Sequence, residues 1–143
     1  MKIIIIVLIL LLPSMSFESI SIKEFVRQEC RRNKISPALF MNLIHAESSW
    51  RPHAMGKLIK IKYKGKYIHT RAIGLCQIIP ELHYQGNKYD LFNPKLNIKI
   101  GIRIYKNCLR KAKGNRVQAL RYYNGQVKNK NNKYIEKILK RRI

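Results

Sequence analysis

Glu47 is the residue whose type and position in this sequence best suit acid chemistry. The apolar residues Phe40, Leu43 and Ile44 follow the spacing of one helix face, and the next position on that face is Glu47. A carboxyl group held against hydrocarbon resists ionisation, so we expect its pKa to be raised. An acid that stays protonated near neutral pH can donate a proton to a leaving group. The spacing leaves an alternative open, a glutamate at the helix end that turns out to solvent.

A second carboxylate near Glu47 has few candidates, because the chain has 7 acidic residues against 30 lysines and arginines. Glu81 and Asp90 both follow Pro80 and are the two that could reach a cleft. Both also suit a solvated loop, which is the simpler interpretation. The sequence therefore predicts chemistry that uses one carboxyl group.

Metal-binding side chains show no recognisable spacing. The cysteines and histidines are Cys30, Cys76, Cys108, His45, His53, His69 and His83. No cysteine pair has the spacing of metal ligands, and the histidines form neither an HxxxH nor an HExxH pattern. We therefore expect no metal and no cofactor. Three cysteines in an exported chain permit one disulfide, and among the open pairings we favour Cys30–Cys108.

The first residues have the features of an export signal. Lys2 precedes an apolar run over residues 3–12 that is too short to cross a bilayer comfortably, and Pro13 ends the run. Small residues follow in Ser14-Met15-Ser16, where a signal peptidase would cleave. We predict a signal peptide at residues 1–16 and one exported domain at residues 17–143, with an uncleaved N-terminal anchor as the alternative.

The formal net charge of +23 indicates a polyanionic partner or surface. Outside the cytoplasm the candidates are cell-wall polymer, anionic lipid headgroups, teichoic-type polymers and nucleic acid. Composition does not choose among them, and genome base composition also explains part of the lysine excess.

The elements that must position Glu47 are mostly helices. Capping residues and apolar periodicity predict helices over about 22–33, 37–47, 93–114, 115–123 and 133–142. Two β-prone runs within residues 57–70 flank the turn Lys64-Gly65-Lys66 and predict a lysine-rich hairpin. Residues 72–80 are mostly apolar around Gln77, and we expect loops over 81–92 and 128–133. The fold class is therefore mainly α with one small β-hairpin.

Four segments in order resemble a known family. They are Glu47-Ser48, residues 74–80 (GLCQIIP), residues 93–101 with Asn93-Pro94, Asn97-Ile98 and Gly101, and residues 119–125 (ALRYYNG). Over about residues 22–140 the chain resembles the lysozyme-like catalytic domain of soluble lytic transglycosylases. It is most similar to the short, single-domain members that accompany secretion, conjugation and pilus machineries.

The resemblance implies cleavage of peptidoglycan between N-acetylmuramic acid and N-acetylglucosamine, with a 1,6-anhydromuramoyl product. By this interpretation Glu47 first protonates the glycosidic oxygen and then takes a proton from the sugar's 6-hydroxyl, so one carboxyl group suffices. Paired carboxylates are the rule in ordinary glycosidases. The expected partners are peptidoglycan glycan strands and a secretion, conjugation or pilus apparatus. We expect a monomer that does not bind nucleic acid.

The resemblance also assigns roles to single residues near Glu47. Gln77 corresponds to a glutamine that lines the cleft and holds the sugar's acetamido group, unless its amide binds local backbone instead. Tyr123 is similar to the tyrosine that orients the catalytic glutamate, with Tyr122 as the alternative if the register is off by one. Ser48 and Asn124 would support the site.

Two positions depart from the family pattern. Cys76 stands where the family commonly has methionine, which would alter the wall of the cleft. The serine that many members carry shortly after an Asn-Pro-like turn is absent at Met55-Gly56, and Thr70 would supply that hydroxyl instead. The inserted hairpin would form a lip of the cleft, where its lysines could bind stem-peptide carboxylates.

Two other functions remain open from the sequence. One is a goose-type lysozyme, a hydrolase on the same fold that needs a placed water and usually a second carboxylate. The other is a non-catalytic basic protein that coats cell wall or anionic membranes, which the hairpin and the residues 137–142 would suit.

Overall fold

A computed structural model describes residues 20–125 and 133–141 of the chain. The large helices are α1 (Ile22–Arg32), α2 (Pro37–Ser48), α4 (Pro94–Lys111), α5 (Arg116–Tyr123) and α6 (Lys133–Lys140). The strands β1 (Ile59–Tyr63) and β2 (Lys66–Thr70) form one antiparallel hairpin, followed by the short helix α3 (Pro80–His83) and the 3-10 helix η1 (Lys88–Phe92). The expected mainly helical fold with one β-hairpin is confirmed. The proposed signal peptide lies outside the described residues.

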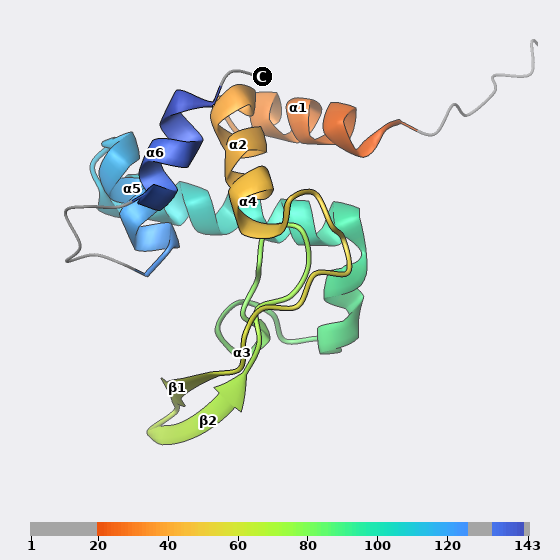
Figure 1. Cartoon of the computed structure of the whole chain (residues 1–143), viewed down its shortest axis with the longest axis vertical. Helices are drawn as coiled ribbons and strands as arrows, with labels where there is room; N and C mark the ends of the chain where they lie inside the picture. The colour runs from red at the N-terminus through yellow and green to blue at the C-terminus, as the bar shows by residue number, and fades with distance from the viewer. Residues whose placement is uncertain (1–19, 126–132, 142–143) are drawn as a thin grey trace, which may run out of the picture.

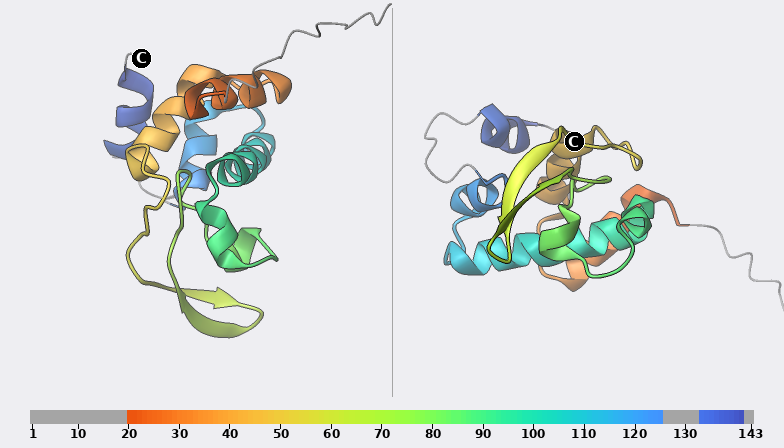
Figure 2. Two further views of the ribbon diagram at one scale, coloured as in Figure 1. Left: turned by 90° about the vertical axis from the view of Figure 1, so that its right-hand side faces the viewer. Right: turned by 90° about the horizontal axis from the view of Figure 1, so that it is seen from below.

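The helix α4 is the central element of the molecule (Figure 1). It packs against α1 on one side and α5 on the other, while α2 packs against both α1 and α6. The buried core draws on all of these helices, with Val26, Phe40, Ile98, Leu120 and Ile138 each at most 1 % exposed. The hairpin projects away from the helices in Figure 1 and in the left view of Figure 2, so its residues contribute little to this core.

The predicted loop over residues 81–92 is partly wrong, because this stretch contains α3 and η1. Pro80 occupies the first turn of α3, where a missing N–H costs nothing. Asn87 begins η1 by accepting a hydrogen bond from the N–H of Tyr89 at 3.0 Å. Both elements are about one turn long, too short to show periodicity. Most of the loop predicted at residues 128–133 lies outside the described residues.

The predicted disulfide between Cys30 and Cys108 is wrong, because all three cysteines are free thiols. Cys30 is fully buried in the core, where a thiol packs like a small apolar group and burial raises its pKa to about 12. Cys108 is half-buried and lines a surface cavity together with Tyr122 of α5. Within the described parts of the chain, no helix is long and apolar enough to span a bilayer.

Candidate active site

Glu47 lies in the last turn of α2, directly before the chain leaves the helix. Ser49 and Trp50 follow in left-handed backbone conformations, with φ of 51° and 63°. The Glu47 side chain is half-buried rather than turned out to solvent, and burial raises the pKa of its carboxyl to about 7. The raised pKa predicted from the helix spacing is therefore confirmed.

A phenol from the far end of the chain contacts this carboxyl group. The hydroxyl of Tyr134, at the start of α6, donates a hydrogen bond to Glu47 Oε1 at 2.5 Å. This bond favours the ionised form and lowers the pKa of Glu47 below the value that burial alone would give. The sequence did not indicate Tyr134 as part of the site. Its only local signal is an aromatic residue on the inward face of a short basic helix.

The helix α6 is held on α2 by the carboxamide of Asn42. Asn42 Nδ2 donates to the backbone oxygens of Ile138 at 2.8 Å and Arg141 at 3.0 Å, which satisfies carbonyls at the end of α6. Ile135 and Ile138 are buried on the same side. The two helices therefore run antiparallel, and the start of α6 lies beside the end of α2. This packing brings Tyr134 to Glu47 across 87 positions of sequence.

Tyr123 lies in the same cluster but has a different hydrogen-bond partner from the one expected. Its hydroxyl donates to the backbone oxygen of Cys76 at 2.9 Å, while the phenol on Glu47 is Tyr134. Burial, with the nearby charges of Cys76 and Glu47, raises the pKa of Tyr123 well above its usual value. Tyr122 contributes to another surface, where Lys111 Nζ lies 4.5 Å from the centre of its ring. Tyr123 is thus the tyrosine of the pair that faces the site.

The segment 73–78 beneath Glu47 is fixed by a fully buried asparagine of α4. Asn97 accepts the N–H of Cys76 at 2.8 Å and donates to the oxygens of Ile73 at 2.9 Å and Leu91 at 2.8 Å. These bonds satisfy a polar side chain that is 0 % exposed. Burial raises the pKa of the Cys76 thiol and the negative charge of Glu47 raises it further, so this segment lies close to the candidate acid.

Two glycines allow this close approach. Gly74 has φ of +79°, and a Cβ there would lie 2.2 Å from Asn97 Nδ2. On α4, a Cβ at Gly101 would lie 2.6 Å from the sulfur of Cys76. Both positions require hydrogen in place of a side chain. The asparagine and glycine spacing seen in the sequence therefore has a packing cause.

Gln77 binds backbone, the alternative that the sequence left open. Its Nε2 donates to the oxygens of Gly74 at 2.9 Å and Ala54 at 3.3 Å. Its backbone has φ of 50°, and its Oε1 lies beside Gly56. The bond to Ala54 joins segment 73–78 to segment 54–56, and the bond to Gly74 stays within segment 73–78.

Ser48 and Asn124 lie at the ends of the two helices that carry Glu47 and Tyr123. Ser48 is buried, and its Oγ donates to the oxygen of Ile44 at 3.2 Å, so the hydroxyl completes the last turn of α2. Asn124 directly follows α5, is half-buried, and donates its backbone N–H to the oxygen of Leu120 at 3.0 Å. Neither hydrogen bond reaches the carboxyl group of Glu47.

Thr70 and the two other candidate carboxylates form separate contacts. The buried hydroxyl of Thr70 donates to Glu81 Oε2 at 2.6 Å, at the base of the hairpin. These two residues line a cavity of about 230 Å³ together with Tyr89. Asp90 is exposed and accepts a hydrogen bond from the hydroxyl of Tyr84 at 2.9 Å. Glu81 and Asp90 therefore each accept a hydrogen bond from a hydroxyl group outside the Glu47–Tyr134 pair.

The comparison with known families bears on this cluster. The family model for the transglycosylase SLT domain matches residues 24–141, which is most of the chain. The chain belongs to the SLT transglycosylase family. The resemblance found in the sequence is confirmed, and the mainly helical fold with its hairpin is lysozyme-like. No curated protein and no solved structure gives a significant match.

Membership of the SLT family indicates a peptidoglycan-degrading enzyme of the lytic transglycosylase type. Proteins with this domain usually act outside the cytoplasm. The segments that carried the resemblance meet in space around Glu47, Cys76, Asn97 and Tyr123. In the described residues, no group of three or more histidine, cysteine, aspartate or glutamate side chains is arranged to hold a metal ion.

Proposed function

We propose that this enzyme cleaves the bond between N-acetylmuramic acid and N-acetylglucosamine and leaves a 1,6-anhydromuramoyl end. Glu47 is the general acid in the first step and the general base in the second. The observation that carries this proposal is the half-buried Glu47 carboxyl at the end of α2, which accepts the Tyr134 hydroxyl and whose pKa burial raises to about 7. At neutral pH both protonation states are then populated, so a single group can give a proton and take one back.

In the first step, Glu47 donates its proton to the glycosidic oxygen as the bond from that oxygen to the anomeric carbon breaks. The N-acetyl carbonyl of the muramoyl residue supports the anomeric carbon as positive charge develops there. The hydrogen bond from Tyr134 stabilises the carboxylate that this step leaves behind.

In the second step, the Glu47 carboxylate removes the proton of the muramoyl 6-hydroxyl. The oxygen of that hydroxyl bonds to the anomeric carbon and closes the anhydro ring. The enzyme regains its starting proton, and no water is consumed. A goose-type hydrolase would instead need a carboxylate to activate water, and Glu81 and Asp90 already bind Thr70 and Tyr84.

The remaining site residues have positioning roles in this proposal. Tyr123 holds the backbone of Cys76, and Gln77 holds segments 54–56 and 73–78 together. In the proposed complex the Gln77 Oε1 accepts a sugar acetamido N–H. Ser48 and Asn124 fix the helix ends that carry the acid and the tyrosine. Thr70 acts at the hairpin base, at the lip of the cleft.

Digestion of purified sacculi in heavy-oxygen water tests the proposed reaction. Mass spectrometry should find muropeptide ends that are one water lighter than hydrolysed ends and contain no solvent oxygen. Ends that carry heavy oxygen at the anomeric position would establish the hydrolase and overturn the proposal. Sacculus binding without any product would favour the basic coat protein.

We further propose that residues 1–16 direct export and that the mature enzyme opens peptidoglycan locally for a secretion, conjugation or pilus apparatus. The apolar run at residues 3–12 and the small residues at 14–16 support export. N-terminal sequencing of the protein recovered from the cell envelope tests this, with a mature start near Phe17 as the expected result. A protein that stays in the cytoplasm with Met1 intact would contradict it.

A further inference from the structure

A row of cations lies along α4, on the side of the helix that is turned away from the candidate active site. We name it the α4 cation row; its members are Lys99, Arg103, Lys106 and Arg110. Their spacing of four, three and four residues places them on one helix face. Asn97 and Gly101, which hold the Cys76 segment, are rotated from this row by roughly half a turn. All four cations are exposed.

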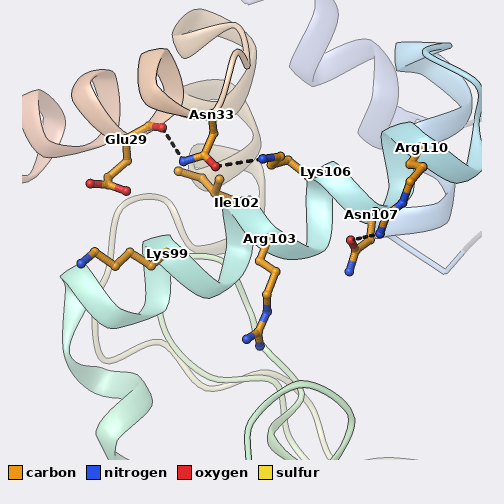
Figure 3. A pocket seen from close by; sticks show the side chains of 8 residues that line it. All are labelled: Glu29, Asn33, Lys99, Ile102, Arg103, Lys106, Asn107 and Arg110. Carbon is orange, nitrogen blue, oxygen red and sulfur yellow. Dashed lines mark hydrogen bonds between the residues drawn. The ribbon is translucent and has the colours of Figure 1, made fainter.

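The α4 cation row borders a groove between α1 and α4 with a volume of about 370 Å³ (Figure 3). This volume lies within the range of roughly 300–1,000 Å³ typical of small-ligand sites. The buried side chain of Ile102 lines the groove between the cations, and Asn33 and Asn107 present carboxamides to it. Glu29 of α1 also lines it.

No member of the α4 cation row forms an ion pair with another described residue. The ion pairs of the described residues join Glu24 to Arg27, Glu29 to Arg32 and Glu136 to Lys140.

The hydrogen bonds of the row go to neutral oxygens. Arg103 donates to the backbone oxygen of His83 at 2.6 Å, and Lys106 donates to Asn33 Oδ1 at 3.1 Å. Arg110 donates to Asn107 Oδ1 at 2.7 Å. The groove therefore presents positive charge, with the Asn33 and Asn107 carboxamides bonded beside it.

We propose that this groove is a second peptidoglycan-binding site, which takes the carboxylate-bearing stem peptide of a glycan strand. Lysine and arginine of the row bind peptide carboxylates, and the side-chain amide nitrogen of Asn107 donates to a peptide C=O. A phosphodiester wall polymer would match the charge as well, and we favour the stem peptide because peptidoglycan is the substrate that the family indicates. The proposal rests on the proposed function only in taking peptidoglycan as the ligand.

The location of the groove has a consequence for catalysis. Because the row and the Cys76 segment lie on opposite faces of α4, a strand held in the groove does not occupy the candidate active site. The groove retains the enzyme on its insoluble polymer while a second strand is cut. Loss of the groove therefore lowers activity on intact sacculi and leaves turnover of short soluble glycans unchanged.

Co-sedimentation with sacculi tests the proposal in a Glu47→Gln background, which separates binding from cleavage. The sacculi are stripped of phosphate-containing polymers by acid. The groove variant replaces Lys99, Arg103, Lys106 and Arg110 with glutamine, and the matched control replaces four exposed cations outside the groove and the hairpin, Lys23, Arg31, Lys113 and Arg116, in the same way. We expect the groove variant to lose roughly tenfold in affinity, since single exposed charge contacts are weak. The control, with the same charge removed, should lose much less.

A second measurement identifies the ligand, with a synthetic stem tetrapeptide as the probe. The side-chain amide NMR signals of Asn33 and Asn107 should shift on titration in the Glu47→Gln protein and not in the groove variant. Equal losses in the groove and control variants would reduce the effect to bulk charge and overturn the proposal. So would wild-type binding that disappears once the phosphate polymers are removed. An enzyme that binds in this way yet makes no anhydro product would overturn the proposed function alone.

Discussion

At the scale of single residues, the chemistry of Glu47 depends on two opposing effects on its pKa. Burial against the end of α2 raises the pKa, and the hydrogen bond from Tyr134 lowers it again in part. Burial is the larger effect, so the pKa settles near 7 rather than near its ordinary value of 4.5. The acid is thereby available at neutral pH without a second carboxylate.

The raised pKa of Glu47 predicts a pH dependence of stability. A folded-state pKa above the unfolded one means that the contribution of Glu47 is fully present below about pH 4.5 and is lost as pH rises through about 7. Glu47→Gln has no such loss. As pH rises across this range, the free energy of unfolding of the variant should increase relative to that of wild type, by at most about 3 kcal/mol. Urea denaturation at several pH values measures it, and two parallel curves would contradict the buried carboxyl group.

Tyr134→Phe should shift the pH profile of activity, with Tyr123→Phe as the matched control. The first step needs protonated Glu47, so activity falls as pH rises through about 7. Removing the Tyr134 hydroxyl removes the bond that lowers the Glu47 pKa, and the falling limb should move to higher pH. Tyr123→Phe breaks a bond to Cys76 instead and should lower activity without moving the limb. Equal shifts in the two variants would refute these separate roles.

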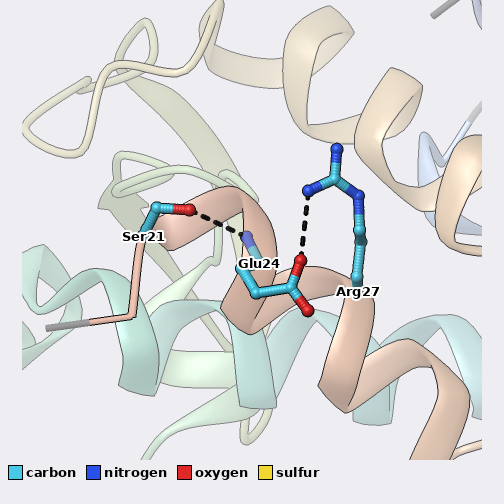
Figure 4. Close-up of polar contacts among 3 residues, drawn as sticks. All are labelled: Ser21, Glu24 and Arg27. Atoms are coloured by element: carbon cyan, nitrogen blue, oxygen red, sulfur yellow. Dashed lines mark hydrogen bonds and ion pairs between the residues drawn. The ribbon is translucent and has the colours of Figure 1, made fainter. Parts of the chain in front are cut away.

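At the scale of elements, the helix starts could be predicted from local signals. Ser21 accepts the N–H of Glu24 at 3.2 Å, and the Glu24 carboxylate turns to Arg27 (Figure 4). Asn93 and Asn115 cap α4 and α5 in the same way. The hairpin turn at Lys64-Gly65 could likewise be predicted from neighbouring residues. Such signals depend on residues within one turn, which is why the sequence alone showed them.

The contacts that complete the site could not be predicted in this way. The bond between Tyr134 and Glu47 depends on how α6 packs on α2, and no local pattern encodes that packing. The resemblance to the family pointed to Tyr123, which lies in the cluster but binds Cys76. For Gln77, the spacing left two roles open, and only the positions of Ala54 and Gly74 show its backbone bonds.

A pair of glycine substitutions tests the packing of the segment below Glu47. Gly74 and Gly65 have nearly equal φ, +79° and +80°, but only Gly74 has neighbours within reach of a Cβ. Gly65→Ala should therefore cost only the left-handed strain, about 1–2 kcal/mol. Gly74→Ala adds a collision with Asn97, and we expect at least about 3 kcal/mol in total and loss of activity. Equal costs in chemical denaturation would show that the close approach is unimportant.

At the scale of the whole molecule, the fold is held by its core without a covalent bridge. The core cluster extends over all five large helices, and two of the three free cysteines are buried in it. Burial keeps the pKa of Cys30 and Cys76 above the usual thiol value, so these groups stay protonated and unreactive. Cysteine count and export suggested a bridge, and only the three-dimensional positions show why none forms.

The thiols lead to a prediction for the purified protein. We expect the unfolding temperature to be the same with and without a reductant, because no disulfide contributes to stability. Alkylation after denaturation without reductant should label Cys30, Cys76 and Cys108. A mass lower by two hydrogens, with only one labelled cysteine, would contradict this account.

The central claim is that one carboxyl group, that of Glu47, gives and regains the proton in peptidoglycan cleavage. The most direct measurement compares the muropeptides that wild type and Glu47→Gln release from the same sacculi. We expect anhydro-muropeptides from wild type and none above background from the variant, at equal unfolding temperatures under acidic conditions. Undiminished release of anhydro-muropeptides by Glu47→Gln would contradict the account.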